Sequence, residues 1–238
     1  MLGYNFSNPA LLVQALTHKS FKEHYNTMRE NQGSLDTQID DYERLEFLGN
    51  SILNFLVAQY YFTTTGDSPH DFQPKQLHKL KTAVVNNVFL SLIVVQRGIH
   101  NFVLYNQNSE QFKKQFDQYV QVVAEILARS RQADQAMPEG NRSRAEALSE
   151  QEFGNVNIEP LYEHSLKIFG DIFESIIGAV FIDCKSISQT ERVLHSMLRP
   201  FLKTHTHVEQ LDDHSRTKLL ELWNSKSYSR QLKIKHDV

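Results

Sequence analysis

One strongly apolar segment of this sequence also carries charged residues. The segment LKIFGDIFESIIGAVFID, residues 166–183, has large apolar side chains at almost every helical angle, so a helix here must be surrounded by other elements. Its polar positions, Lys167, Asp171 and Glu174, fall on one stripe together with Gly178. Burying charge is costly unless the charge is paired or binds a metal. The chain must therefore build its core around this helix and give these charges a partner.

A second segment, ERLEFLGNSIL at residues 43–53, combines a buried stripe with a polar face. Leu45, Leu48 and Ile52 recur at helical spacing. Glu46 and Asn50 are one turn apart on a different face. Small glycines permit close approach of two backbones, and these two segments contain three of them: Gly49, Gly170 and Gly178.

Close packing of the two helices would create an oxygen-rich pocket from Glu46, Asn50, Asp171 and Glu174. Such ligands suit Mg²⁺, and also Mn²⁺. A bound ion of this kind serves in-line displacement at a phosphodiester. The alternative is a structural salt-bridge network in which Lys167 pairs with Asp171 or Glu174, because buried ion pairs also occur without catalysis.

The remaining chain predicts an all-α fold. Apolar periodicity indicates helices near residues 8–22, 40–63, 74–97, 109–130, 162–184 and 187–203. Ser7 or Asn8 is expected to cap the first helix, with Pro9 in its first turn. Residues 23–39 and 63–73 are polar and contain Gly or Pro, which predicts loops.

We predict one main domain over residues 1–203. Residues 131–160 lack a sustained apolar face, so they are expected to form a mobile insertion. Residues 204–238 are expected to be a C-terminal helical tail, in which SRTKLLELWNSKSY suggests an amphipathic helix and RQLKIKHDV begins like a strand. That change of character suggests the truncated start of another module.

The composition indicates where in the cell the protein is located and which binding partners are expected. An apolar share of 40% supports a core, and the sequence contains no secretory signal and no expected membrane span. The single cysteine, Cys184, excludes an internal disulfide framework. We therefore expect an intracellular protein, in the cytoplasm or alternatively the nucleus. A net charge of −3 argues against a general nucleic-acid binder.

Nucleic-acid binding would then need a local basic patch. Lys75, His78, Lys79 and Lys81 form such a cluster on one predicted helix. They could contact the phosphates of a nucleic acid, which position a duplex without reading its sequence. A solvated helix face is the alternative.

Four motifs in this order resemble the ribonuclease III family. ERLEFLGNS is similar to its signature ERLEFLGDS, and GDIFESIIGAVFID resembles its second active-site helix. LTHKSF at 16–21 and LHKLKTAVVNN at 77–87 match its first and central helices. KIFGDIFES, the paired VVNN, the insertion and MLRPFL at 197–202 resemble the second, b-type nuclease domains of the Dicer family. The tail then resembles the start of a double-stranded-RNA-binding domain.

The resemblance implies Mg²⁺-dependent cleavage of double-stranded RNA. It assigns metal or water-positioning roles to Glu46, Asp171 and Glu174, and a phosphate-side role to Lys167. It makes Phe47 an aromatic that inserts into a partner subunit. Such domains act as homodimers, or as pseudo-dimers with a sister domain, and their two sites cut opposite strands. It also assigns Asn86 and Asn87 to support of the metal site, for which a helix-surface role is the alternative.

Asn50 departs from the family pattern, which has an acidic residue there. An amide offers one oxygen but no charge, so we expect weaker metal binding and slower cleavage. Asn50 is either the natural residue of a weakened domain or a substitution made to trap an uncleaved state. Two other functions follow: a weakened domain that binds RNA or a partner nuclease, and a helical scaffold with a buried charge network.

Overall fold

A computed structural model describes residues 2–32, 38–63, 72–135 and 166–204 of the chain. The chain divides into two compact units, residues 1–206 and 207–238, and every described residue lies in the first. Most of the predicted insertion and the tail beyond residue 204 lie outside the described residues. Within those residues the regular elements are helices and one isolated bridge between Thr17 and Leu104, which confirms the all-α prediction. The helices are α1 (Pro9–Ala15), α2 (Lys19–Asn31), α3 (Glu43–Thr63), α4 (Pro74–Val84), α5 (Asn87–Gln96), η1 (Ile99–Phe102), α6 (Glu110–Gln135), α9 (Lys167–Cys184) and α10 (Ile187–Thr204).

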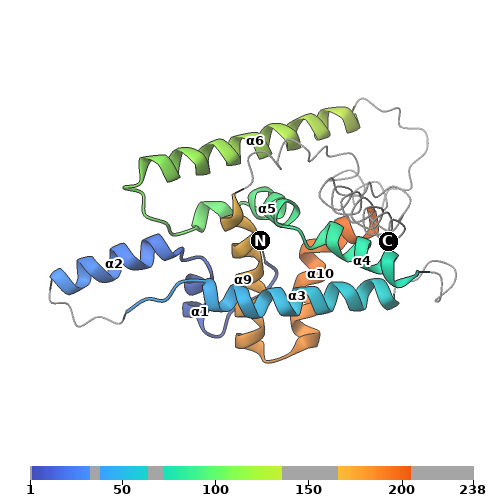
Figure 1. Ribbon diagram of the computed structural model, residues 1–238, viewed down its shortest axis with the longest axis horizontal. Helices are drawn as coiled ribbons and strands as arrows, with labels where there is room; N and C mark the ends of the chain where they lie inside the picture. Colours follow the sequence, from blue (N-terminus) through green and yellow to red (C-terminus); the bar gives the residue numbers. More distant parts are fainter. Residues whose placement is uncertain (1, 33–37, 64–71, 136–165, 205–238) are drawn as a thin grey trace, which may run out of the picture. The chain divides into compact units, whose positions relative to one another are not determined.

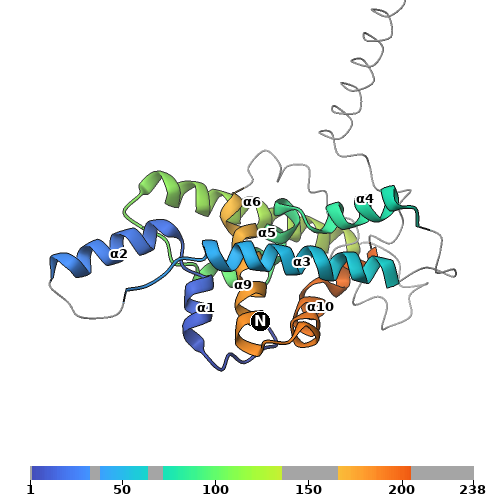
Figure 2. The same ribbon diagram turned by 60° about the horizontal axis from the view of Figure 1, so that its bottom comes forward.

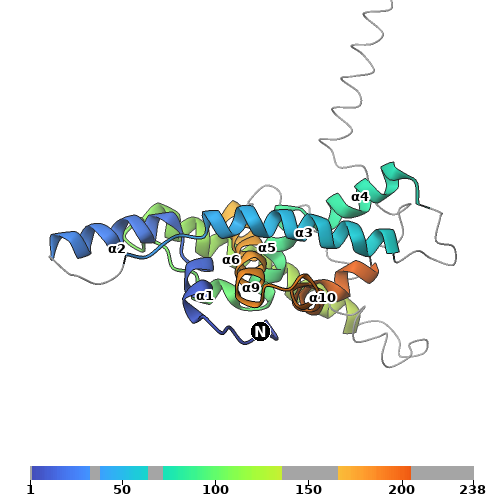
Figure 3. The same cartoon turned by 90° about the horizontal axis from the view of Figure 1, so that it is seen from below.

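The apolar helix α9 is the centre of the core. Every residue from Ile168 to Val180 is buried, and α1, α3, α5 and α10 all pack against it. Figure 1 and Figure 2 both show α3 crossing α9, and Figure 3 shows α9 nearly end-on with α1 and α10 on either side. Burial on all sides explains why α9 has large apolar side chains around its whole circumference.

The crossing of α3 and α9 depends on two glycines. A Cβ atom on Gly49 would lie 1.7 Å from the carbonyl oxygen of Glu174, and one on Gly178 would lie 2.2 Å from that of Leu45. Both values are far inside van der Waals contact, so only glycine fits at either position. The predicted close approach is therefore present. Gly170 serves a different contact, because its missing Cβ leaves room for the Asn87 side chain of α5.

The prediction of a single helix over residues 8–22 is wrong. Asn8 caps α1 as expected, with its side chain accepting from the Ala10 amide at 3.2 Å. The helix then stops, because His18 is extended and its amide donates to Leu104. α2 restarts at Lys19 and runs to Asn31, into the segment predicted as a loop. Distant backbone pairing has overridden the local periodicity.

The predicted helix over residues 74–97 is also divided in two. Asn86 is extended and caps α5, with its side chain accepting from the Phe89 amide. Taken together, residues Pro74–Gln96 are long and apolar enough to cross a membrane, judged by length and composition only. No membrane span was predicted from the sequence. However, 56% of that apolar stretch is buried in the protein, and the core position of α5 accounts for its composition. The last helix before the gap, α6, extends to Gln135, five residues beyond its predicted end.

The N-terminal segment is attached to the end of α9 through one carboxylate. Asp183 accepts hydrogen bonds from the Tyr4 hydroxyl at 2.6 Å and from the amides of Ser7 and Asn8 at 2.8 Å each. These donors, the Tyr4 hydroxyl first, hold the pKa of Asp183 below its usual range. This clamp fixes the chain just before α1 begins.

Candidate active site

Three acidic side chains from two helices converge where α3 crosses α9. Glu46 comes from the first turns of α3, and Asp171 and Glu174 come from α9. One carboxylate oxygen from each lies within 4.8 Å of the others. Asp171 and Glu174 are buried, with 7% and 9% exposure, whereas Glu46 is half-buried. The structure therefore brings together the three acids that the sequence predicted; we call them the acidic cluster.

Lys167 lies at the surface of the acidic cluster. Its Nζ is 2.9 Å from Asp171 and 3.3 Å from Glu46, while its side chain is 72% exposed. The pairing with Asp171 was one of the predicted alternatives, and the pairing with Glu46 was not predicted. Among the described residues Glu174 forms no ion pair, so a salt-bridge network accounts for only part of the cluster.

The protonation of the cluster reflects this incomplete neutralisation. Burial, followed by the charges of Asp171 and Glu46, raises the pKa of Glu174 to about 7. Burial also raises the pKa of Asp171, although the contact with Lys167 opposes the change. Burial acts to lower the pKa of Lys167, but its bonds to the two acids outweigh this effect and raise it. Near neutral pH, Lys167 and a proton on Glu174 thus balance part of the negative charge.

Replacing Glu174 by glutamine should stabilise the metal-free protein at pH 8. The folded-state pKa of Glu174, about 7, lies above the ordinary value of 4.5, so the folded state binds the proton more tightly. Stability contributed by this group is therefore greatest at low pH and is lost as the pH rises to about 7. We expect Glu174→Gln to raise the free energy of unfolding by about 1 to 2 kcal/mol at pH 8, and by less at pH 5.

Thermal unfolding in a chelating buffer at the two pH values measures this difference. Glu43→Gln is the control, because Glu43 lies in the first turn of α3 with a side chain that is 56% exposed. It should leave stability nearly unchanged. A Glu174→Gln protein that is less stable than the wild type at pH 8 would contradict the charge balance described here.

Asn50 lies beside the acidic cluster but does not present a free oxygen to it. Its amide acts to lower the pKa of Glu174, the sign expected when an amide N–H is directed at a carboxylate. Its Oδ1 accepts a hydrogen bond from Asn54. The use of Asn50 as an oxygen ligand therefore stays a prediction.

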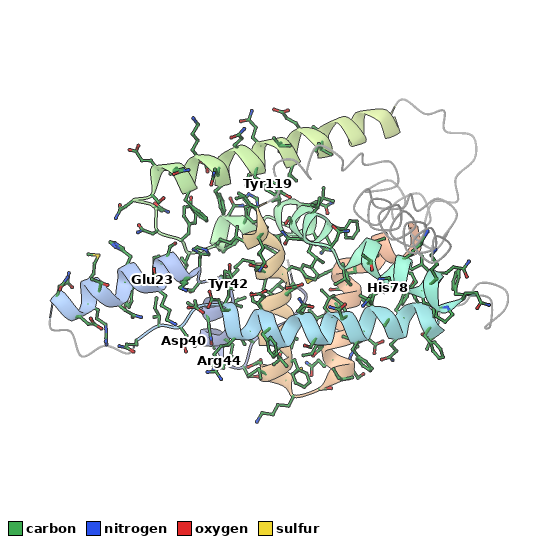
Figure 4. The ribbon with its side chains drawn as sticks, in the orientation of Figure 1. Glu23, Asp40, Tyr42, Arg44, His78 and Tyr119 are labelled. Carbon is green, nitrogen blue, oxygen red and sulfur yellow. The ribbon has the colours of Figure 1, made fainter. Side chains whose placement is uncertain are left out.

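The basic cluster is far from the acids along α3. Figure 4 shows Tyr42 at the N-terminal end of α3 and His78 on α4 near the opposite end. Lys75, Lys79 and Lys81 belong to the same short helix as His78. RNA contact by these lysines stays a prediction.

Phe47 and the two asparagines of the central motif occupy different surroundings. Phe47 is 79% exposed next to Glu46, beside a hollow of about 560 Å³ that Leu11, Leu48 and Ile182 help to line. Asn86 caps α5, and Asn87 lies against Gly170. The structure therefore gives both asparagines a role in the backbone and packing, and support of a metal site by them stays a prediction.

Two residues at the site, Tyr42 and Asn54, were not predicted from the sequence. The Tyr42 hydroxyl donates to Asp171 at 3.3 Å, and the Tyr42 carbonyl accepts from the Glu46 amide at 2.8 Å. Asn54 contacts Asn50, from which it is one helical turn away. That spacing is visible in the sequence, whereas nothing local signals the contact between Tyr42 and Asp171.

Three carboxylates that meet where two helices of an all-α fold cross are typical of a site for a divalent cation, and comparison with known proteins identifies the family. The ribonuclease III domain family matches residues 43–185, which include the whole acidic cluster. The chain therefore belongs to the ribonuclease III family of double-stranded RNA endonucleases.

Relatives with this domain include Dicer proteins. Endoribonuclease Dicer of Gallus gallus is 30% identical over 203 residues, which are 85% of this chain and 9% of the relative. Endoribonuclease Dcr-1 of Drosophila melanogaster is 29% identical over 202 residues, which are 84% of this chain and 7% of the relative. The chain thus spans less than a tenth of these relatives. The nuclease domain of ribonuclease III from Campylobacter jejuni has a TM-score of 0.48 and 22% identity, covering 84% of this chain and 93% of that one.

Proposed function

We propose that this chain is a Dicer-type endoribonuclease domain that cleaves double-stranded RNA into small RNAs inside cells, with a divalent cation as cofactor. The proposal rests mainly on the acidic cluster, whose three carboxylate oxygens lie within 4.8 Å of one another in a chain of the ribonuclease III family. Similarity to two Dicer proteins supports the Dicer type. The motif KIFGDIFES and the paired VVNN favour the b-type domain.

The donor set fits a hard divalent cation. Glu46, Asp171 and Glu174 offer carboxylate oxygens only, which suit Mg²⁺ and Mn²⁺ better than softer metals. Asp171 and Glu174 are buried without full neutralisation, so a cation bound between them would be strongly attracted by their charge. A divalent cation supplies positive charge that stabilises negative charge developing on a phosphate.

The side chains at the site have separate proposed roles. In the metal-free protein Glu174 changes its protonation near neutral pH because its pKa is about 7, so binding of a cation there would release this proton. Lys167 is exposed enough for its ammonium group to reach a phosphate oxygen. Tyr42 keeps Asp171 in place through its hydroxyl. Lys75, Lys79 and Lys81 would hold the duplex by phosphates, with little sequence preference.

A second copy of the chain, or a sister domain, is the proposed partner. Phe47 is 79% exposed, which is unusual for a large aromatic side chain in contact with water alone. The hollow that it helps to line has an apolar part formed by Leu11, Leu48 and Ile182. In a twofold dimer each Phe47 can enter the hollow of the other copy. Two sites then face one duplex, as cleavage of both strands requires.

Phe47→Ala should weaken self-association by at least about tenfold, because an aromatic in a pocket is a typical interface hot spot. Sedimentation equilibrium measures the change. Phe62→Ala is the matched control, since Phe62 is 71% exposed in the last turn of α3. Equal dissociation constants for the wild type and Phe47→Ala would exclude this interface.

The function itself is tested by incubating the chain with a long RNA duplex and Mg²⁺ or Mn²⁺. We expect slow cleavage of the duplex, none without a divalent cation, and none with Asp171→Asn, which keeps the shape of a buried ligand but removes its charge. Single-stranded RNA and duplex DNA should stay intact. Cleavage that Asp171→Asn does not affect would refute the assignment of the site.

Asn50 favours a second function, in which the domain is a weakened nuclease that binds RNA or supports a partner nuclease. The amide supplies no charge where the family has an acid. Titration with Mn²⁺ separates the two functions. If the chain is an enzyme, Mn²⁺ should bind at a saturable site that Asp171→Asn removes. If it is a binding domain, it should bind RNA but show no saturable Mn²⁺ site.

A further inference from the structure

The side chain of Asn50 is held by the residue one turn along α3. The Nδ2 group of Asn54 donates to the backbone carbonyl of Asn50 at 2.9 Å and to its Oδ1 at 2.5 Å. A backbone carbonyl only accepts hydrogen bonds. The first of these bonds therefore determines which end of the Asn54 amide faces Asn50.

The orientation of Asn54 in turn decides which end of the Asn50 amide faces the acidic cluster. Because Asn54 donates, Asn50 must offer its Oδ1 in that direction. Its Nδ2 is then the end left for the acidic cluster, which agrees with the lowering effect of the Asn50 amide on the pKa of Glu174. Position 50 thus supplies N–H groups to the cluster, and its one ligand oxygen is engaged elsewhere.

We propose that Asn54 is a positioning residue that holds the Oδ1 of Asn50 away from the acidic cluster and so excludes position 50 from the cation's ligands. This inference rests on the proposed function. It leaves Glu46, Asp171 and Glu174 as the ligand set. An amide N–H directed at one of these carboxylates also competes with a cation for its lone pairs.

The contact predicts that metal binding can be improved without changing position 50. If residue 54 cannot donate, the Asn50 amide is free to turn over, because terminal amide torsions have broad energy wells. Its Oδ1 can then join the carboxylates. Leucine at position 54 removes the donor without adding charge, and aspartate replaces the donor by an acceptor that favours the turned amide.

Isothermal titration of the full chain with Mn²⁺ tests this inference. We expect Asn54→Leu to bind Mn²⁺ about three- to tenfold more tightly than the wild type, the effect of releasing roughly one hydrogen bond. Asn54→Asp should bind at least as tightly as Asn54→Leu. Gln59→Leu is the control, because Gln59 lies farther along α3 and about half a turn around from Asn50. It should bind like the wild type.

Thermal unfolding of the same variants separates positioning from structure. A purely structural Asn54 would lower the melting temperature on substitution without tightening Mn²⁺ binding, which would overturn the inference. If Asn54→Asp binds Mn²⁺ more tightly and Asn54→Leu does not, the added charge explains the gain, and this result would also overturn the inference. Unchanged binding in both Asn54 variants, with tighter binding in Asn50→Asp, would overturn the inference and leave the proposed function intact. Absence of binding in every variant, Asn50→Asp included, would overturn both.

Discussion

Asn50→Asp is expected to raise the rate of Mg²⁺-dependent cleavage of double-stranded RNA by about two to three orders of magnitude, the usual effect of one well-placed electrostatic group at an active site. The change restores a fourth carboxylate beside Glu46, Asp171 and Glu174. It also removes the amide that now acts to lower the pKa of Glu174. Both effects make the cluster more negative and more open to a cation.

Single-turnover cleavage of one RNA duplex by the wild type and the variant measures this gain. Gln59→Glu is the matched control, because it makes the same change from amide to acid on α3 but on the face away from Asn50. It should leave the rate nearly unchanged. A negligible rate in Asn50→Asp would refute the assignment of position 50.

Gly49→Ala is expected to destabilise the protein by about 3 kcal/mol or more, because overpacking here involves backbone that cannot move aside easily. The added Cβ would lie 1.7 Å from the carbonyl oxygen of Glu174. In an isolated helix the same substitution stabilises by about 1 kcal/mol, since alanine is the better helix former. The sign of the effect therefore reports directly on the packing of α3 against α9.

Chemical denaturation measures the change, and Ser51→Ala on the exposed side of α3 is the control. We expect that variant to stay within about 0.5 kcal/mol of the wild type. We also expect Gly49→Ala to lose Mn²⁺ binding, because separating the two helices moves Glu46 away from Glu174. A variant that is more stable than the wild type would contradict the crossing described here.

Local sequence signals predicted much of this fold correctly. The helices over residues 43–63 and 187–204 match their predicted ranges closely, and α9 begins five residues later than predicted. The breaks at His18 and Asn86 escaped prediction for a physical reason. The first depends on pairing of His18 with Leu104, a contact across the chain that periodicity cannot detect.

The acidic cluster was likewise predicted only in part from the sequence. Helical spacing placed Asp171 and Glu174 on one stripe and Glu46 beside Asn50, and the glycines predicted a close crossing. Spacing did not predict that Lys167 bridges Asp171 and Glu46, or that Tyr42 donates to Asp171. The contact of Lys167 with Glu46 and that of Tyr42 with Asp171 join residues more than 120 positions apart.

The sequence alone determined which helices are amphipathic, which one is buried on all sides and which polar residues share a helix face, because those properties follow from residue type and from spacing within a few turns. The tertiary structure alone decided that α3 and α9 cross at Gly49 and Gly178, and how the cluster is protonated. The same packing decided that the Asn50 amide faces Glu174. Such outcomes depend on burial and on partners from distant segments, which the folded chain brings together.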